Sequence, residues 1–204
     1  YDRLVLAPGL EFDLMPGMAN LSQYDTDLPH AWQAGPQTAL LRRQLVALTP
    51  GQNVVLTIPL APYRCPPGPY ERVCVIADWL KANKLGIKII VLDANLDIVV
   101  EKDNFSRAFT TLYAGIVDYR PGSTVTNIDV GALAVTYDDG VDRRTESAGV
   151  INAIPPQRAP KLLADAGLLS ADPAKPFAPV NVLRPLAVPL VAAIALTLAG
   201  SEPA

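Results

Sequence analysis

The chain has 204 residues, of which 50% are hydrophobic and 18% are charged, and its formal net charge is −3. This composition supplies enough apolar side chains for a buried core and argues against a disordered chain. The acidic balance argues against a nucleic-acid-binding surface. One histidine and two cysteines, Cys65 and Cys74, are too few for a disulfide scaffold or a zinc site, so we expect no metal centre.

The first half of the chain predicts strands and helices in alternation. Prolines and glycines mark the ends of these elements. Continuous apolar runs, which are typical of parallel strands buried on both faces, stand on either side of a helix with an apolar stripe. The predicted elements are, in order, strand 4–7, a loop-rich connection over 10–35, helix 36–48, strand 53–59, a proline-rich loop over 60–68, helix 69–83 and strand 88–93.

The second half predicts one more long helix and then short strands. Apolar residues at helical spacing favour a helix over 104–114. The turn sequence Asp138-Asp139-Gly140 after two short strands is typical of an antiparallel meander. The predicted elements are helix 104–114, strands 124–128 and 132–137, a buried strand 149–154 and a short helix 158–166.

The unit made by strand 53–59, helix 69–83 and strand 88–93 is of the dinucleotide-binding kind. We therefore expect an α/β fold, namely a Rossmann-like FAD/NAD(P)-binding domain with three layers around a parallel sheet and a small antiparallel meander. Residues 46–154 would form this domain. Residues 1–45 would be the C-terminal part of an interrupted FAD-binding domain, and residues 155–204 would return to that domain as its remnant.

The ends of the chain indicate a piece of a longer protein. Tyr1 is followed at once by an apolar strand, with no signal peptide before it. Residues 185–201 carry no charge, but prolines interrupt the run, and the clean part from Leu190 to Gly200 is shorter than the ~20 apolar residues of a membrane helix. We favour a buried strand or helix for this tail over a membrane span.

Four segments carry unusual strings of residues. The most specific runs from Pro62 to Arg72 and reads Pro-Tyr-Arg-Cys-Pro-Pro-Gly-Pro-Tyr-Glu-Arg, and the others are Tyr1–Gly9, Pro29–Gly35 and Ile154–Ala159. Together they resemble the flavoprotein subunit of flavocytochrome c sulfide dehydrogenase, a family related to sulfide:quinone oxidoreductases and the wider pyridine nucleotide-disulfide oxidoreductase superfamily. The resemblance extends over residues 1–181, which is nearly the whole chain.

The resemblance implies an FAD-dependent enzyme whose flavin lies between two dinucleotide folds. It further implies that a redox cysteine pair beside the flavin oxidises sulfide, and that the electrons pass to a cytochrome c subunit in the periplasm. Cys65 would be the catalytic member of that pair. The residues that would contact FAD are Ala7, Pro8 and Gly9 at a strand-to-loop crossing, and Pro156 and Gln157 at a strand end.

Three features depart from the family pattern. The glycine-rich phosphate loop is absent, and we expect it to lie upstream of Tyr1, so this chain alone would bind FAD weakly. Ala178 stands where the family's Trp-Cys-Pro-Val-Asp segment has the partner cysteine. The tail from Pro185 to Ala204 does not match the family's continuation, which carries a Gly-Asp-Ala motif.

The two cysteines receive different interpretations. Cys65 lies just before the start of helix 69–83, where the positive end of the helix and the neighbouring Arg64 and Arg72 favour a thiolate. A thiolate is the form that attacks sulfur and can form an adduct with a flavin ring. Cys74, inside the helix, is interpreted as a small half-buried hydrophobe and not as a replacement partner for Cys65.

Asp93 ends a strand at the place where an NAD-binding fold puts its ribose-binding acid. However, the proline-rich loop replaces the Gly-x-Gly-x-x-Gly turn, and prolines lack the N–H groups that would bind a pyrophosphate. We therefore interpret Asp93 as a strand-end cap and expect no NAD binding. His30 and Trp32 also match the family, and we interpret them as packing residues of a loop.

The preferred function is an FAD-dependent sulfide dehydrogenase that passes electrons to cytochrome c. Two alternatives remain open. The first is a catalytically inactive nucleotide-fold module that binds a partner chain, which Ala178 and the missing glycine-rich loop favour. The second is a quinone-coupled sulfide oxidoreductase at a membrane surface, which an apolar C-terminal helix would favour.

Overall fold

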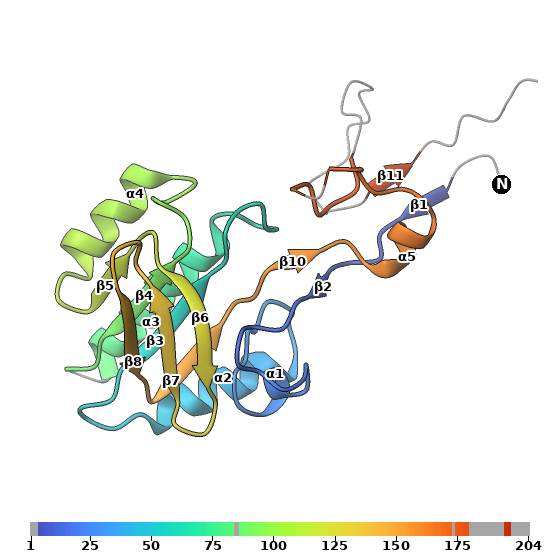
Figure 1. Cartoon of the computed structure of the whole chain (residues 1–204). Coiled ribbons are helices and arrows are strands. Elements are labelled where there is room, and N and C mark those ends of the chain that lie inside the picture. The colour runs from blue at the N-terminus through green and yellow to red at the C-terminus, as the bar shows by residue number, and fades with distance from the viewer. Residues whose placement is uncertain (1–3, 84–85, 173, 180–193, 197–204) are drawn as a thin grey trace, which may run out of the picture. The chain divides into compact units, whose positions relative to one another are not determined.

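The computed structural model describes residues 4–83, 86–172, 174–179 and 194–196 (Figure 1). The chain divides into two compact units, a central unit Asp13–Pro156 and a second unit that combines Tyr1–Phe12 with Gln157–Ala204. Residues 13–45 therefore fold within the central unit, whereas we expected a boundary after residue 45. The assignment of the chain ends to an FAD-binding domain stays a prediction.

The centre of the Asp13–Pro156 unit is a four-stranded parallel sheet in the order β5-β4-β3-β9. Its inner strands, β3 (Val54–Ile58) and β4 (Ile89–Asp93), are buried at every position because both faces of the sheet are covered. β9 (Val150–Ala153) lies beside β3, and β5 (Val117–Arg120) lies beside β4. The predicted buried strands 53–59, 88–93 and 149–154 are confirmed, and all three are parallel. β5 was not predicted, since its half-buried sequence Val-Asp-Tyr-Arg has no apolar run.

Helices cover one face of this sheet. They are α2 (Pro36–Ala47), α3 (Gly68–Asn83) and α4 (Lys102–Arg107), which continues into the π-helical turn η1 (Ala108–Leu112). Alternate strand residues point toward them, among them Leu56 of β3 and Val91 of β4. The predicted helices over 36–48, 69–83 and 104–114 are confirmed, with a change from α to π geometry in the last one.

The opposite face is covered by an antiparallel meander, whose strands are β6 (Thr124–Asp129), β7 (Ala134–Asp138) and β8 (Arg143–Ser147) (Figure 1). The other set of alternate strand residues, such as Val55 and Leu92, packs here against Ile128 and Val135. The loop before α2 contains the short helix α1 (Gln23–Thr26) and adds Tyr24 to the same core. The α/β fold with three layers and a meander is thus confirmed. β8 was not predicted, because its sequence Arg-Arg-Thr-Glu-Ser is polar and largely exposed.

The unit made of the chain ends contains two short antiparallel strand pairs. β1 (Leu4–Leu6) pairs with β11 (Ile194–Leu196), and β2 (Glu11–Phe12) pairs with β10 (Gln157–Arg158). After β10, helix α5 (Lys161–Asp165) buries Leu163 in a small apolar cluster. Apart from β11, the apolar tail from residue 185 lies outside the described residues. None of the helices that the structure describes is long and apolar enough to cross a membrane.

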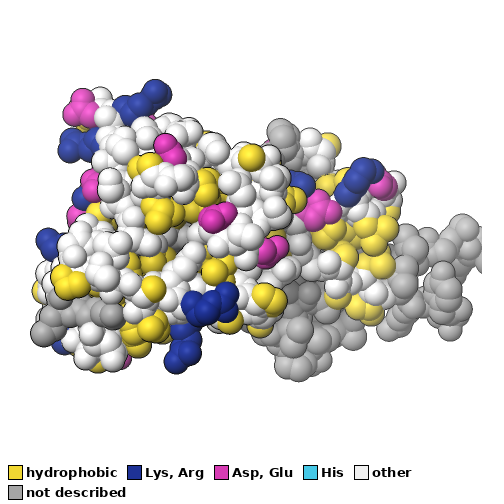
Figure 2. All heavy atoms as spheres, turned by 90° about the horizontal axis from the view of Figure 1, so that it is seen from below, with side chains coloured by type: hydrophobic (Ala, Val, Ile, Leu, Met, Phe, Trp, Pro, Cys, Tyr) yellow, Lys and Arg dark blue, Asp and Glu magenta, His cyan; other side chains and the backbone are white. Residues whose placement is uncertain are grey.

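Figure 2 shows one face of the molecule, on which charged side chains of both signs are interspersed with hydrophobic ones. Lysine and arginine side chains occur in several separate places on this face. The visible face therefore has no continuous basic patch.

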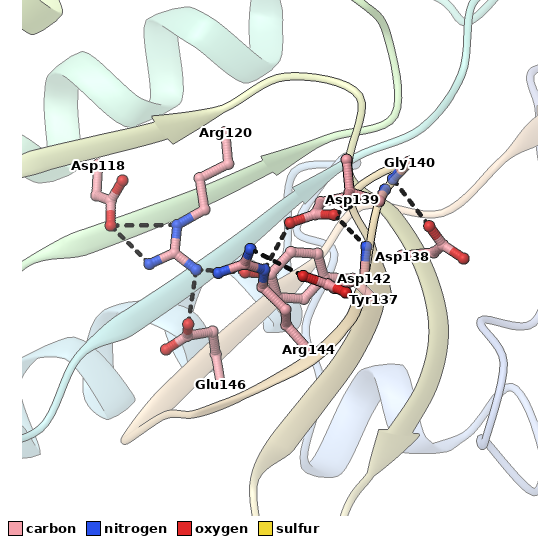
Figure 3. A network of polar contacts seen from close by, with 10 residues as sticks. Asp118, Arg120, Tyr137, Asp138, Asp139, Gly140, Asp142, Arg144 and Glu146 are labelled. Carbon is pink, nitrogen blue, oxygen red and sulfur yellow. Dashed lines mark hydrogen bonds and ion pairs between the residues drawn. The ribbon is translucent and has the colours of Figure 1, made fainter.

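A network of charged side chains fixes the meander to the edge strand β5 (Figure 3). Arg120 of β5 donates hydrogen bonds to Asp118 at 2.7 Å, to Glu146 of β8 at 2.6 Å and to the Tyr137 hydroxyl of β7 at 2.5 Å. These contacts, that to Asp118 most of all, raise the pKa of Arg120 above its ordinary value. At the exposed end of the network, Arg144 pairs with Asp139 at 2.5 Å. One half-buried guanidinium thus joins three strands.

Replacing Arg120 by alanine is expected to lower the free energy of unfolding by about 2 kcal/mol, because the Tyr137 hydroxyl and the Glu146 carboxylate lose their donor. Urea denaturation of the purified chain measures the change. Arg144→Ala is the control, since the Arg144 side chain is 54% exposed against 28% for Arg120, and its loss should be much smaller. Equal losses in the two variants would contradict the role given to Arg120.

Candidate functional site

The loop Pro59–Pro67, which we call the Cys65 loop, leads from β3 into α3. It leaves the sheet at the carboxyl end of the parallel strands, which is where open α/β sheets bind their ligands. Cys65 is exposed, and its backbone φ of +56° lies in the left-handed region that residues with a Cβ rarely adopt. Its carbonyl accepts a hydrogen bond of 2.9 Å from the Gly68 N–H at the start of α3. The structure thus places the predicted catalytic thiol on the surface, next to a helix start.

The thiol has close neighbours on its inner side. A Cβ atom at Gly68 would lie 3.2 Å from the Cys65 Sγ and 2.9 Å from the Cη2 of Trp32. The sulfur and the indole ring therefore both pack against the Gly68 backbone, and a larger residue there would displace one of them. Trp32 is consequently a packing residue, as interpreted from the sequence. Its indole ring also forms a wall on one side of the Cys65 thiol.

The loop that carries Trp32 is held by a half-buried arginine. Arg72 of α3 donates hydrogen bonds of 2.6 Å to the carbonyl oxygens of both His30 and Ala31. The His30 Nδ1 accepts a hydrogen bond of 3.0 Å from the backbone N–H of Trp32. Burial lowers the pKa of His30 to about 4, so the imidazole ring is neutral near pH 7. We expected Arg72 to support the Cys65 thiolate; the structure shows its guanidinium bonded to loop carbonyls, so Arg72 holds the Trp32 wall in place.

Asp93, at the end of β4, is fully buried and receives four hydrogen bonds from described residues. Its Oδ1 accepts the backbone N–H of Asn95 at 2.9 Å and the side-chain amide of Asn95 at 2.7 Å. Its Oδ2 accepts the hydroxyls of Tyr70 and Tyr119, each at 2.8 Å. Burial raises the pKa of Asp93, and the four hydrogen bonds act against that shift. We call these four residues the Asp93 cluster.

The Asp93 cluster bears out the interpretation of Asp93 as a strand-end cap, since the bonds to Asn95 close a turn. Sequence reasoning missed its three partners. The spacing of Asp93 and Asn95 is a recognisable turn signal, but nothing in the sequence indicates that tyrosines from α3 and β5 meet at the same carboxylate. A ribose hydroxyl would have to displace one of these bonds to reach Asp93.

The predicted FAD contacts are divided between the two units. Ala7, Pro8 and Gly9 are exposed after β1, and a Cβ atom at Gly9 would meet no other atom within 4 Å. Pro156 is exposed, whereas Gln157 is only 3% exposed. The exposed segments fit close contact with a flat ring or a sugar chain, but the buried Gln157 side chain does not. Their part in FAD binding stays a prediction.

A cavity of about 500 Å³ opens beside the Arg120 network, with Ser123, Tyr137 and Arg144 in its wall. Arg120 and Arg144 both form ion pairs in this wall. Their partners are four carboxylates, those of Asp118, Asp139, Asp142 and Glu146. The excess of negative charge opposes an anionic ligand, and the arginines occupy the carboxylates that a cation would need. We therefore interpret the network as a structural clamp. Within the part of the chain that the structure describes, no three acidic, histidine or cysteine side chains gather as a metal site requires.

Cys74 and position 178 differ in their surroundings from Cys65. Cys74 is half-buried on α3, and burial together with the nearby Glu71 raises the pKa of its thiol. Neither Cys65 nor Cys74 is part of a disulfide. Ala178, which we expected in place of the family's partner cysteine, is buried in an apolar cluster with Ala159 and Leu163. Its side chain thus serves packing in the unit of the chain ends.

A family model described as the central part of the sulfide dehydrogenase [flavocytochrome c] flavoprotein chain matches residues 38–155, which is more than half of the chain. The chain belongs to this family. The matched region contains the Cys65 loop, the Asp93 cluster and the meander. The resemblance seen in the sequence is thereby confirmed, and the protein is a member of a flavoprotein oxidoreductase family.

Solved structures share the fold at low sequence identity. A chain of the Tetrahymena thermophila mitochondrial ATP synthase matches with a TM-score of 0.55 and 15% identity over 87% of this chain and 49% of that chain. An engineered water-forming NADPH oxidase bound to NADPH matches with a TM-score of 0.52 and 13% identity over 81% of this chain and 33% of that chain. These likenesses show the fold alone, and this chain spans about half or less of the length of those it matches.

The native chain is expected to present two free thiols, with Cys65 alkylated about tenfold faster than Cys74 near neutral pH, because Cys65 is exposed and burial keeps Cys74 protonated. Limiting alkylation followed by mass mapping measures both rates in one sample, and Cys65→Ser and Cys74→Ser identify each signal. Equal labelling would remove the case for a reactive Cys65. Labelling that requires reductant would show a disulfide between them.

No saturable binding of NADH is expected in the micromolar range, because both oxygens of Asp93 are engaged and the carboxylate is fully buried. Titration of the chain with NADH, followed by the fluorescence of the reduced nicotinamide, measures the affinity. Saturable micromolar binding would show that the Asp93 cluster opens to admit a ribose.

Proposed function

We propose that this protein is an FAD-dependent sulfide dehydrogenase that oxidises sulfide at Cys65 and passes the electrons to a cytochrome c subunit. The observation that supports the proposal is the exposed Cys65 thiol, held at the carboxyl end of the parallel sheet inside the region that matches the family. The proposal includes the periplasm as the location, since the cytochrome-linked form of the family implies it.

In this proposal, different residues of the chain react with sulfide and contact the flavin. Cys65 would supply the sulfur that becomes bonded to the sulfur of sulfide, a step that releases the thiol proton and two electrons, and these electrons would pass to the flavin. Trp32 and Gly68 fix where the Cys65 sulfur stands. The exposed segment Ala7, Pro8 and Gly9, with Pro156, would contact the FAD. When bound, the flavin supplies an acceptor for two electrons that can leave one at a time to a haem.

A second candidate is a catalytically inactive module that binds a partner chain. Ala178 favours it, because a buried alanine replaces the second thiol that the family uses. The two candidates differ in one measurable property, since only the dehydrogenase requires Cys65 to react.

The test is anaerobic addition of sulfide to the purified, FAD-loaded protein in the presence of oxidised cytochrome c. Reduction of the cytochrome is expected in the wild type, with a loss of at least about 100-fold in Cys65→Ser, because the nucleophilic sulfur is gone. Cys74→Ser is the matched control and should retain the rate, since Cys74 is half-buried within α3.

The other outcomes discriminate among the alternatives. Sulfide-dependent reduction of a quinone but not of cytochrome c would favour the quinone-coupled form. A flavin-loaded wild type that reduces neither acceptor would favour the inactive module. Equal activity in wild type and Cys65→Ser would remove Cys65 from the mechanism.

A further inference from the structure

The Cys65 loop is tied at its start to the buried Asp93 carboxylate. The Asn95 side-chain amide donates to the Pro59 carbonyl at 3.0 Å, and the Ala61 N–H donates to the Asn95 Oδ1 at 3.0 Å. The same amide donates to the Asp93 Oδ1 at 2.7 Å. One side chain, itself held by Asp93, thus fixes two backbone positions of the loop.

A second route reaches the loop on both sides of the cysteine. Tyr63 is buried, and its hydroxyl lies 3.4 Å from the carbonyl oxygen of Pro66, so its side chain spans the segment that contains Cys65. The hydroxyl groups of Tyr63 and Tyr70 also interact, and each affects the pKa of the other. Tyr70 in turn donates to the Asp93 Oδ2 at 2.8 Å. The middle of the loop is therefore connected to the same carboxylate through two tyrosines.

The conformation of Cys65 explains why such support is needed. A φ of +56° brings the Cβ of an L-residue close to the following carbonyl, so the left-handed region is disfavoured for cysteine. Such a conformation persists only where the surroundings determine it by other contacts. Residues 59, 61, 63 and 66 supply these contacts. If they loosen, Cys65 can relax, and its sulfur leaves its place against Gly68 and Trp32.

We propose that Asp93 is a positioning residue for the Cys65 thiol, acting through Asn95 and through the Tyr70–Tyr63 pair. Asp93 does not contact the thiol, and its own surroundings are Tyr70 from α3, Tyr119 from β5 and Asn95 from the turn after β4. The catalytic meaning of this positioning rests on the proposed function of Cys65, but the positioning itself is measurable on the thiol.

The test compares two tyrosines that make equivalent bonds to Asp93. Tyr70→Phe and Tyr119→Phe each remove one 2.8 Å hydrogen bond to the Oδ2, but only Tyr70 continues to Tyr63 and the loop. Alkylation rates of Cys65 and Cys74 are measured in the same full-length molecules across pH by mass mapping. In Tyr70→Phe and in Asp93→Asn the rate of Cys65 is expected to change by about threefold or more, with a shifted pH profile, while Cys74 keeps its rate.

Tyr119→Phe is expected to leave the Cys65 profile as in the wild type. An unchanged Cys65 profile in Tyr70→Phe overturns the proposal. So does an equal change at Cys65 and Cys74, or an equal effect of Tyr119→Phe, because either result means general loosening. If Asp93→Asn does not fold, the two tyrosine variants decide alone. Failure of the proposed function is distinct, since it appears as wild-type protein without sulfide oxidation whatever the thiol profiles show.

Discussion

The buried carboxylate of Asp93 is the constraint on which the carboxyl end of the sheet depends. A fully buried charge is unfavourable unless donors surround it, and here four hydrogen bonds from β4's own turn, from α3 and from β5 do so. Each donor is thereby held in position as well, because its removal would leave a buried carboxylate oxygen without that hydrogen bond. Helix α3, strands β4 and β5 and the Cys65 loop are thus joined around one carboxylate. Hydrogen bonds fix the distances and directions between these elements more narrowly than apolar contacts do.

The layers supply the rigid support that this arrangement requires. Strands β3 and β4 direct alternate residues into two separate cores, one beneath the helices and one beneath the meander. The meander is held to the sheet a second time, by Arg120, the last residue of β5. β5 carries both Tyr119, which reaches Asp93, and Arg120, which reaches β7 and β8. A short edge strand with little hydrophobic character therefore connects the two polar networks of the central unit.

The sequence allowed the elements with strong apolar periodicity to be predicted, and not those held by polar contacts. Strands 54–58, 89–93 and 150–153 lie in continuous apolar runs, so their burial was predictable. β5 and β8 are rich in charged residues whose partners come from other elements, and a local pattern does not contain that information. The same reason explains the site. Cys65 stands in a long, specific string, whereas Tyr70 and Tyr119 are 49 residues apart in the chain and meet only because β5 pairs with β4. Arg72 was expected to act on the thiol by its charge, which stays a prediction, whereas its hydrogen bonds to the carbonyls of the Trp32 loop could not be predicted from the sequence.

The position of Asp93 also explains how one fold can serve a different chemistry. In a dinucleotide-binding fold, an acid at the end of this strand is useful when it faces a ribose and remains accessible. Here tyrosines from both neighbouring elements cover it, and a proline-rich loop that carries a thiol replaces the glycine-rich turn. The two changes support each other. Asp93 holds the loop through Asn95, and the loop needs that support because its cysteine adopts a conformation that cysteine disfavours. The acid at the end of β4 thus supports the loop that carries Cys65 from within the protein.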